Sequence, residues 1–199
     1  LSISKQTWYV GTAAKKAGAI QADMLQNVWN TDKIKLDRNK NNKLDYILIE
    51  GEQTHFDAVR RTNGFLESSQ NLPLNQLTNL SADWQRDLAS MKFSKLDTSI
   101  IQSAEAIICN NDDMALGAWE ALEEKGCTEV QVVGIDGIEE VRELVDEDKI
   151  LGSVLCDTKL HAKALMQFID VLAFHNGSVE KLNLENERYY MIPLTKVEK

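Results

Sequence analysis

The chain has 199 residues, of which 43% are hydrophobic, and a formal net charge of −9. This length supports one large domain or two small ones with a true core. The acidic balance argues against nucleic acids and anionic membrane surfaces as partners and suits neutral or cationic ligands. The three cysteines, Cys109, Cys127 and Cys156, form no C-x-x-C pair and lie in or beside apolar segments. We therefore expect buried thiols rather than zinc or redox chemistry.

Short apolar strands alternate with amphipathic helices along the chain. In the first half the pattern predicts strands at 8–10, 46–49 and 77–80, and helices at 13–29, 57–69 and 83–93. In the second half it predicts strands at 106–109, 130–135, 150–155 and 189–193, and helices at 114–125, 138–146 and 159–175, the last one stopped by Gly177. Unbroken apolar strands are typical of sheets buried on both faces. We therefore predict an α/β fold with a parallel sheet flanked by helices.

Oxygen-bearing side chains recur at alternate positions of the loop that precedes the strand at 46–49. They are Asp37, Asn39, Asn41 and Asp45. This spacing resembles an EF-hand loop, in which such oxygens and a backbone carbonyl, here that of Lys43, surround a hard cation. Asn42 takes the place of the usual glycine, and asparagine tolerates positive φ. Leu48 stands where the final glutamate is expected, so a further ligand must come from elsewhere. A solvated polar turn is the alternative interpretation.

Polar side chains also follow the ends of the predicted strands, where ligands bind in parallel sheets. His55, Asp57 and Arg61 follow one strand, and Trp84 follows the next. Asn111, Asp136 and Cys156 follow the later strands. We expect these residues to share one rim of the sheet. Carboxylate, amide and guanidinium groups can bind adjacent hydroxyls, and an indole can cover the C–H face of a pyranose. The rim therefore indicates a sugar site.

Other interpretations of these residues stay open. The run from Asn110 to Asp113 can serve simply as a helix N-cap, and Arg61 can pair on the surface with Asp57. Asp57 and Asp136 could flank a glycosidic bond, as in a glycosidase. However, the sequence has no phosphate-cradling glycine loop, no nucleophile elbow and no H-E-x-x-H motif. We therefore predict a binding protein rather than an enzyme.

Four collinear motifs, together with the loop at Asp37, resemble the periplasmic galactose- and glucose-binding proteins. They are Trp8-Tyr9-Val10-Gly11-Thr12, Gly51-Glu52-x-x-His55-x-Asp57-Ala58-x-x-Arg61-Thr62, Asn110-Asn111-Asp112-x-Met114-Ala115-x-Gly117 and Gly134-x-Asp136. The similarity covers nearly the whole chain. It implies one lobe of the type I periplasmic binding protein fold, with a partial second lobe.

The resemblance also implies a set of roles. The sugar hydroxyls would be held by His55, Asp57, Arg61, Asn111 and Asp136, and Trp84 would stack on the ring. Cys156 stands where the family has a further hydroxyl-binding asparagine, and a thiol bonds hydroxyls weakly. Calcium would be held by Asp37, Asn39, Asn41, the Lys43 carbonyl, Asp45 and the remote Glu105.

The resemblance divides the chain into three parts. Residues 1–156 would form the sugar- and calcium-binding lobe, which is the carboxyl-terminal domain of the family. Residues 157–188 would belong to the second lobe, whose remainder lies in an opening segment that this sequence lacks. Residues 189–199 would return to the first lobe as a strand and tail.

The implied function is to bind a hexose, glucose or galactose, as the receptor of an ABC sugar importer, by hinge closure of two lobes. Its partners would be the sugar and the membrane subunits of the importer, with no nucleic acid. The location would be periplasmic or extracytoplasmic, with membrane contact only through a lipid anchor outside this chain. The alternative is the effector-binding core of a sugar-responsive transcription repressor. The cation loop and the acidity favour the receptor.

Overall fold

The structure is a computed structural model that describes residues 7–174, 179 and 182–199. It divides into two compact units. The larger unit is Ala14–Leu155 with Thr195–Lys199, and the smaller unit comprises the described residues of Leu1–Ala13 and Cys156–Leu194. The assignment of 157–188 to a second lobe remains a prediction. Among the described residues, no helix combines the length and the apolar character that a membrane span requires.

A six-stranded sheet is the centre of the larger unit. Its strands are β2 (Leu44–Glu50), β3 (Leu74–Ser81), β4 (Ala106–Cys109), β5 (Gln131–Val133), β6 (Gly152–Cys156) and β8 (Leu194–Glu198). The spatial order is β3-β2-β4-β5-β6-β8, and the four pairs from β3 to β6 are parallel. The predicted α/β fold with a parallel sheet is confirmed.

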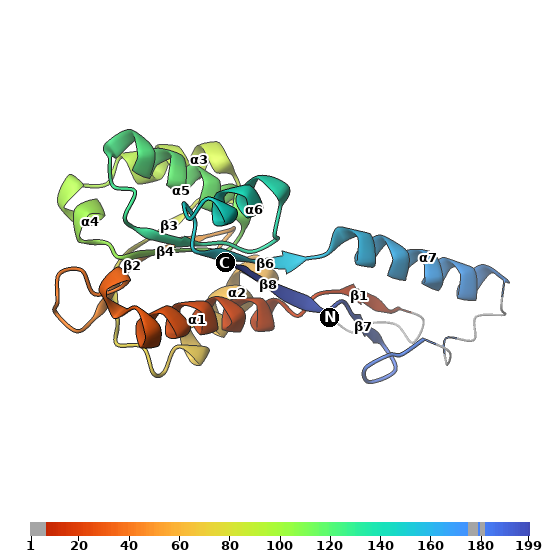
Figure 1. Cartoon of the computed structure of the whole chain (residues 1–199). Helices are drawn as coiled ribbons and strands as arrows, with labels where there is room; N and C mark the ends of the chain where they lie inside the picture. The colour runs from red at the N-terminus through yellow and green to blue at the C-terminus, as the bar shows by residue number, and fades with distance from the viewer. Residues whose placement is uncertain (1–6, 175–178, 180–181) are drawn as a thin grey trace. The chain divides into compact units, whose positions relative to one another are not determined.

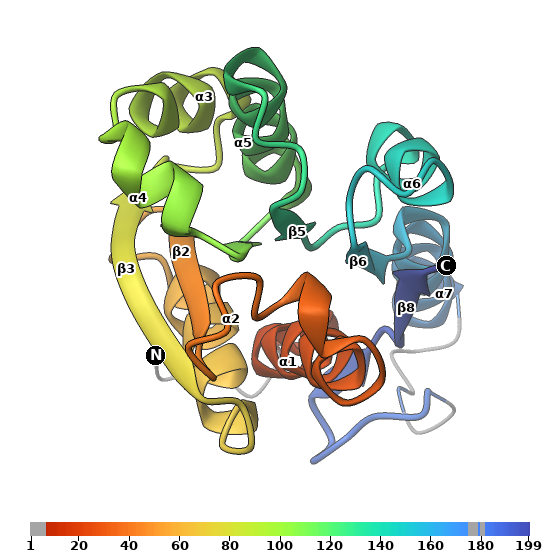
Figure 2. The same cartoon turned by 60° about the vertical axis from the view of Figure 1, so that its left-hand side comes forward.

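Helices cover both faces of this sheet (Figures 1 and 2). One face carries α1 (Ala14–Thr31) and α2 (Phe56–Ser68). The other carries α3 (Arg86–Ser94), α4 (Thr98–Ser103), α5 (Asp112–Lys125) and α6 (Glu139–Asp146). A short 3₁₀ helix, η1, covers Lys33–Lys35 after α1. Because side chains alternate along a strand, β2 sends Ile47 and Ile49 into the core under α3 and α5, and Tyr46 and Leu48 into the core under α1 and α2.

Three details differ from the sequence predictions. The helix predicted from residue 83 begins at Arg86, because Asp83 and Trp84 have φ of 48° and 67°, which a right-handed helix excludes. The helix α4 was not predicted, since six residues are too few for a clear apolar period. Strand β8 was also missed, because its sequence LTKVE holds only two strongly apolar residues. Gly126 ends α5 with φ 67°, as predicted.

The smaller unit contains a two-stranded parallel sheet and one long helix. Strand β1 (Tyr9–Gly11) pairs with β7 (Tyr189–Met191), and α7 covers Thr158–Phe174. Phe168 of α7 contacts the rings of Trp8 and Tyr190, with centroids 6.5 and 5.8 Å away. The predicted helix end at His175 and the stop at Gly177 lie outside the described residues. Apolar side chains of α7 that are exposed include Leu165, Met166 and Ile169.

Candidate functional site

The first turn of α2 carries two of the predicted sugar ligands. His55 is the N-cap, and its Nδ1 accepts a hydrogen bond from the Asp57 N–H at 3.2 Å. An imidazole that accepts at Nδ1 carries its proton at Nε2 when neutral, so His55 presents Nε2–H as a donor. Asp57 is half-buried in the first helical turn, where the helix dipole favours a negative charge.

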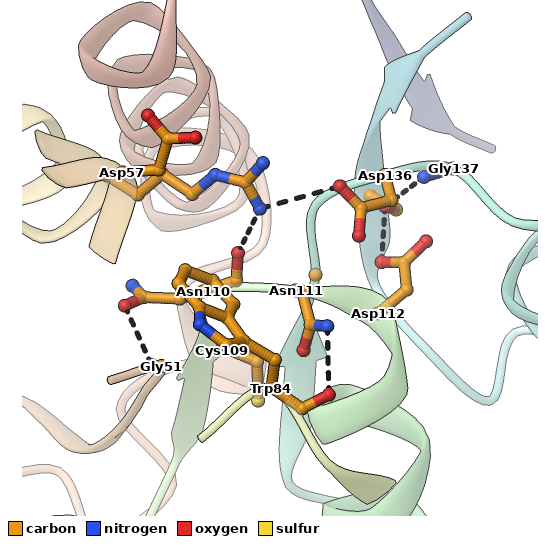
Figure 3. A network of polar contacts seen from close by, with 12 residues as sticks. Gly51, Asp57, Trp84, Cys109, Asn110, Asn111, Asp112, Asp136 and Gly137 are labelled. Atoms are coloured by element: carbon orange, nitrogen blue, oxygen red, sulfur yellow. Dashed lines mark hydrogen bonds and ion pairs between the residues drawn. The ribbon is translucent and has the colours of Figure 1, made fainter. Parts of the chain in front are cut away.

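Arg61 lies one turn further along α2 and reaches across the ends of two strands. Its Nη1 donates to the backbone carbonyl of Asn110 and lies 3.4 Å from Oδ1 of Asp136 (Figure 3). The Arg61 side chain is only 12% exposed. Its Nε is buried and, within the described residues, has no hydrogen-bond partner. A buried guanidinium N–H without an acceptor is costly. This N–H can still donate a hydrogen bond to a ligand oxygen.

Trp84 lies between β3 and α3, and its ring is close to His55, the N-cap of α2, and to Arg61 of α2. Its ring stands edge-on to the His55 ring, 5.2 Å between centroids, and the Arg61 guanidinium lies 5.6 Å from the indole centroid. The indole also covers Gly51, where an added Cβ would come within 2.3 Å of it. Glycine at 51 is therefore what lets the ring lie flat on the end of β2.

The end of β4 supplies two asparagines with different environments (Figure 3). Asn110 is fully buried; its Oδ1 accepts the Gly51 N–H and its Nδ2 donates to Thr62. Asn111 is the N-cap of α5, and its Oδ1 accepts the Met114 N–H at 3.0 Å. The Nδ2 of Asn111 donates to the Trp84 carbonyl at 3.3 Å. These bonds fix both amides in place before any ligand arrives.

Asp136 follows β5 with an unusual backbone, φ 130°. Burial raises the pKa of its carboxyl to about 6, although the nearby Arg61 acts to lower it. The side chain is 34% exposed, so one edge of the carboxylate still faces solvent. The structure thus brings Arg61, Trp84 and Asp136 into one cluster, with His55 and Asn111 beside Trp84.

Cys156 is the last residue of β6, is half-buried and is counted with the smaller unit. None of the three cysteines forms a disulfide, and Cys109 and Cys127 are buried. The prediction of thiols buried in or beside the core is confirmed for these two.

The side-chain oxygens of the loop before β2 accept hydrogen bonds from the loop's own backbone N–H groups. Oδ1 of Asp37 accepts the Asn42 N–H at 3.0 Å, and Asn42 has φ 60°, the left-handed conformation for which it was expected. Oδ1 of Asn39 accepts the Asn41 N–H, and Oδ1 of Asn41 accepts the Lys43 N–H. The loop is therefore ordered by its own side chains rather than being a loose polar turn.

Two buried carboxylates stand beside this loop at the start of β2 and β4. Glu105 is 1% exposed, and its two oxygens accept the N–H groups of Asn39 and Asp45. Burial raises the pKa of Glu105, and the charge of Asp45 adds to this effect. Asp45 is also buried, but hydrogen bonds from Asn75, Asn39 and Asn41 outweigh burial and lower its pKa.

This donor set contains only oxygen ligands and an excess of negative charge, the chemistry that calcium requires. Lys33 is bonded to the loop, with its Nζ 3.2 Å from Asp37 and 2.7 Å from Asn42 Oδ1. In the part of the chain that the structure describes, no three acidic, histidine or cysteine side chains form a ready metal-binding group. The amides bonded to Asp45 would have to turn their oxygens inward to hold a cation.

The family is identified by a comparison with known protein families. The model of the periplasmic binding protein domain matches residues 2–176. The chain belongs to this family. The members are binding proteins, and the prediction that this chain is not an enzyme is confirmed by this membership.

The relatives of this periplasmic binding protein include sugar and polyol receptors. It is 33% identical over 199 residues to the D-galactose/methyl-galactoside binding periplasmic protein MglB of Haemophilus influenzae, covering 98% of this chain and 60% of the relative. It is 28% identical over 152 residues to the xylitol-binding protein of Mycolicibacterium smegmatis, covering 76% of this chain and 42% of that protein. The chain thus spans about 60% or less of the length of these relatives.

Solved structures of the same family share the fold. An ABC transporter solute binding protein from Bacillus halodurans with bound myo-inositol has a TM-score of 0.76 at 24% identity, covering 99% of this chain and 62% of that one. One from Actinobacillus succinogenes with bound D-allose has a TM-score of 0.75 at 21% identity, covering 96% and 60%. These similarities confirm the predicted type I periplasmic binding protein fold.

Sequence reasoning missed several polar residues of this periplasmic binding protein. Asn75 donates to Asp45 from the neighbouring strand β3, a contact that only the β2–β3 register reveals. The Asn110 carbonyl holds Arg61, although the run from 110 to 113 was interpreted as a helix cap. Asp112 was named only as a member of that run and of one family motif, yet it is fully buried. A fully buried aspartate in a helix first turn has no signal in a single sequence.

Proposed function

We propose that this chain is the sugar- and calcium-binding lobe of a periplasmic or extracytoplasmic receptor that delivers a hexose, glucose or galactose, to an ABC importer. The observation that carries the proposal is the cluster of Arg61, Asp136 and Trp84 at the carboxyl ends of the parallel strands. The chain's family and the galactose-binding relative, 33% identical, support the same class of ligand. Xylitol and allose relatives make other polyols the competing ligands.

The chemistry of the cluster suits a neutral polyol. Arg61 donates from Nη1 to Asp136, and its buried Nε has no acceptor among the described residues. A hydroxyl that donates to Asp136 and accepts from Arg61 would satisfy both groups. Because carboxylates accept and guanidinium groups donate in fixed directions, such pairs select the orientation of adjacent hydroxyls. The Trp84 indole supplies the apolar surface on which the C–H face of a sugar ring can lie.

Calcium would be held at the opposite end of β2. The ligands would be Asp37, Asn39, Asn41, the Lys43 carbonyl, Asp45 and Glu105. Asp37, Asp45 and Glu105 are all less than 10% exposed, so their mutual repulsion is poorly screened by water. A divalent cation would neutralise this repulsion and lock the loop. Its role would be structural, because the loop precedes β2 whereas His55 and Asp57 follow it.

Sugar binding in this family would need more polypeptide than this chain. The galactose-binding relative extends beyond the 60% that the chain matches. A receptor that closes two lobes on its ligand binds tightly only when both lobes make contacts. We therefore expect weak binding by the 199 residues alone and tight binding by a longer product of the same gene.

Isothermal titration calorimetry tests the proposal. The longer gene product and the 199-residue chain are titrated with glucose, galactose, allose, xylitol and myo-inositol. We expect glucose or galactose to bind the longer product with the highest affinity. Tight binding by the isolated chain would contradict the two-lobe requirement, and no binding of any sugar by either would contradict the function. An amino-terminal DNA-binding domain in the full gene product would instead favour the repressor alternative.

A further inference from the structure

A buried carboxylate stands directly behind Asp136. Asp112, the first residue of α5, is fully buried, and both of its oxygens accept hydrogen bonds. Oδ1 accepts the Ser153 hydroxyl at 2.6 Å, and Oδ2 accepts the Ile138 N–H at 2.9 Å. The Ser153 oxygen in turn accepts the Gly137 N–H at 3.2 Å. Asp112 therefore ties α5 both to β6 and to the turn that follows Asp136 (Figure 3).

The backbone ladder between β5 and β6 is broken beside this carboxylate. The two strands share the pair Val133–Gly152, and then only an isolated bridge between Asp136 and Leu155. An added Cβ on Gly134 would lie 2.0 Å from Oδ1 of Asp112. Glycine at 134 is thus required for the carboxylate to enter the gap. The Gly134 and Asp136 N–H groups still donate to the carbonyls of Gly152 and Val154, and the bonds to Ser153 and Asp112 take over at the next two N–H groups.

We propose that Asp112 is a positioning residue of the sugar site, whose carboxylate holds the turn that presents Asp136, directly through Ile138 and indirectly through Ser153. The proposal rests on the proposed sugar-binding function of the rim. Asp136 has φ 130°, which residues with a side chain rarely adopt. A strained residue persists only where its surroundings over-determine it. Here the Asp136 N–H donates to Val154, and the next two N–H groups are held by Ser153 and Asp112.

The charge of Asp112 also acts on Asp136. Three charged groups affect the Asp136 carboxyl, namely Arg61 of α2 and Asp112 and Asp113 of α5. Burial is the main reason that the pKa of Asp136 is raised to about 6; Arg61 opposes the shift and Asp112 adds to it. Neutralising Asp112 without changing its shape should therefore lower the pKa of Asp136. A residue that served only general stability would leave this value unchanged.

Three variants of the 199-residue chain separate the contributions of bond and charge. Asp112→Asn removes the charge and an acceptor oxygen, and Ser153→Ala removes the hydroxyl but keeps the charge. Asp113→Asn is the matched control for the amide exchange, since Asp113 is exposed and lies in the same helical turn. Without sugar, NMR measures the amide exchange of Gly137 and Ile138 and the carboxyl titration of Asp136. Calorimetry with galactose on the longer gene product at pH 7.5 measures the effect on affinity.

We expect Asp112→Asn to speed exchange at Ile138, to lower the pKa of Asp136 and to weaken galactose binding by roughly tenfold, as for a lost hydrogen bond to a charged group. Ser153→Ala should speed exchange at Gly137 and weaken binding, and it carries the test if Asp112→Asn does not fold. Asp113→Asn should leave both amides protected. Unchanged exchange and pKa in folded variants, or exchange that rises evenly over the whole chain, would overturn the proposal. If the wild type binds no sugar while the NMR changes occur, the proposed function fails, but the role of Asp112 in holding the turn after Asp136 stands.

Discussion

Strands β2 and β4 carry a polar cluster at each end, and the two clusters are built from different chemistry. At the amino ends Asp45 and Glu105 lie beside the loop of Asp37. At the carboxyl ends the groups are Asn110 and the Arg61–Asp136 pair. The register that pairs Tyr46 with Ala106 and Ile49 with Cys109 aligns both ends. The two clusters are separated by about 20 Å, the length of six strand residues.

The difference between the clusters lies in their charge balance. The amino-end cluster gathers three buried carboxylates that are bonded mostly to neutral amides and backbone N–H groups. At the carboxyl end, Asp136 pairs with the Arg61 guanidinium beside an indole. A second carboxylate there, the buried Asp112, is bonded to Ser153 and to the Ile138 N–H. An excess of carboxylate favours a cation, whereas a balanced pair with an apolar surface favours a neutral polyol. One pair of strands therefore carries, at its two ends, clusters whose chemistry suits different ligands.

Removing a charged partner at the carboxyl end should have the largest effect. In the longer gene product, we expect Asp136→Ala to weaken binding of glucose or galactose by about 2–5 kcal/mol, because Arg61 would be left buried and unpaired. Asp57→Ala should weaken it by at least about tenfold, or roughly 1.4 kcal/mol. Calorimetry measures both. His161→Ala on α7 is the control and should change little. Wild-type affinity in both aspartate variants would contradict the assignment of the site.

Calcium should act on the amino end alone. Metal at a hundred times its Kd would stabilise the fold by about 2.7 kcal/mol. In a chain of this size, this is a rise in Tm of roughly 5–11 °C. Differential scanning calorimetry of chelated and calcium-loaded protein measures the shift. Glu105→Gln should abolish most of it, whereas Asp87→Asn, an exposed acidic control on α3, should retain it. A Tm that does not respond to calcium in metal-stripped protein would exclude the site.

Substitution of Trp84 tests, with a smaller expected effect, whether the clusters at the two ends of the strands act independently. Trp84→Ala should lose about 0.5–1.5 kcal/mol of sugar binding beyond the buried area. Gly51→Ala should act in the same direction, because its Cβ would force the indole off the end of β2. Calorimetry with galactose and a calcium melting series on both variants measure the outcome. A changed calcium response in either variant would show that the two ends of the strands are coupled.

The sequence predicted the fold because the buried strands are continuous apolar runs. Residues 46–49 of β2 and Ala106–Cys109 are such runs, and the rule for parallel sheets then places the residues that follow them at one edge. The sequence alone did not reveal which side chains contact one another. Asn75 lies directly opposite Asp45 in the register of β2 and β3, and no local sequence pattern encodes that register.

The left-handed backbone at Trp84 is a second feature that the local sequence pattern did not predict. The apolar and acidic residues after Ala82 are compatible with a helix, so periodicity extended the helix to residue 83. Trp84 has φ of 67°, and its ring packs against Gly51, which is 33 positions earlier in the chain. Tertiary packing therefore overrode a local preference at a residue that we assign to the sugar site, and strained backbone concentrates at such places.

The pH dependence of stability gives the smallest and most specific effect. Because the pKa of Asp136 is about 6 in the folded protein and the ordinary pKa of an aspartate is 3.8, the folded state binds more protons than the unfolded state between about pH 4 and 6. The stability contributed by this group therefore falls as the pH rises through that window. Asp136→Asn removes the penalty, so we expect its Tm to exceed that of the wild type at pH 7.5 and the gain to disappear at pH 4.

Thermal melts of wild type, Asp136→Asn and Asp113→Asn at the two pH values measure this difference. Since the Asp136 side chain is 34% exposed, solvent screening should keep the gain small. The exposed Asp113 control should show no comparable gain. A gain of equal size at pH 4 and pH 7.5 would mean that packing, and not ionisation, sets the cost of this carboxylate. A gain confined to pH 7.5 would mean that the rim keeps an ionised aspartate at the expense of stability, as expected of a group held in place to bind a ligand.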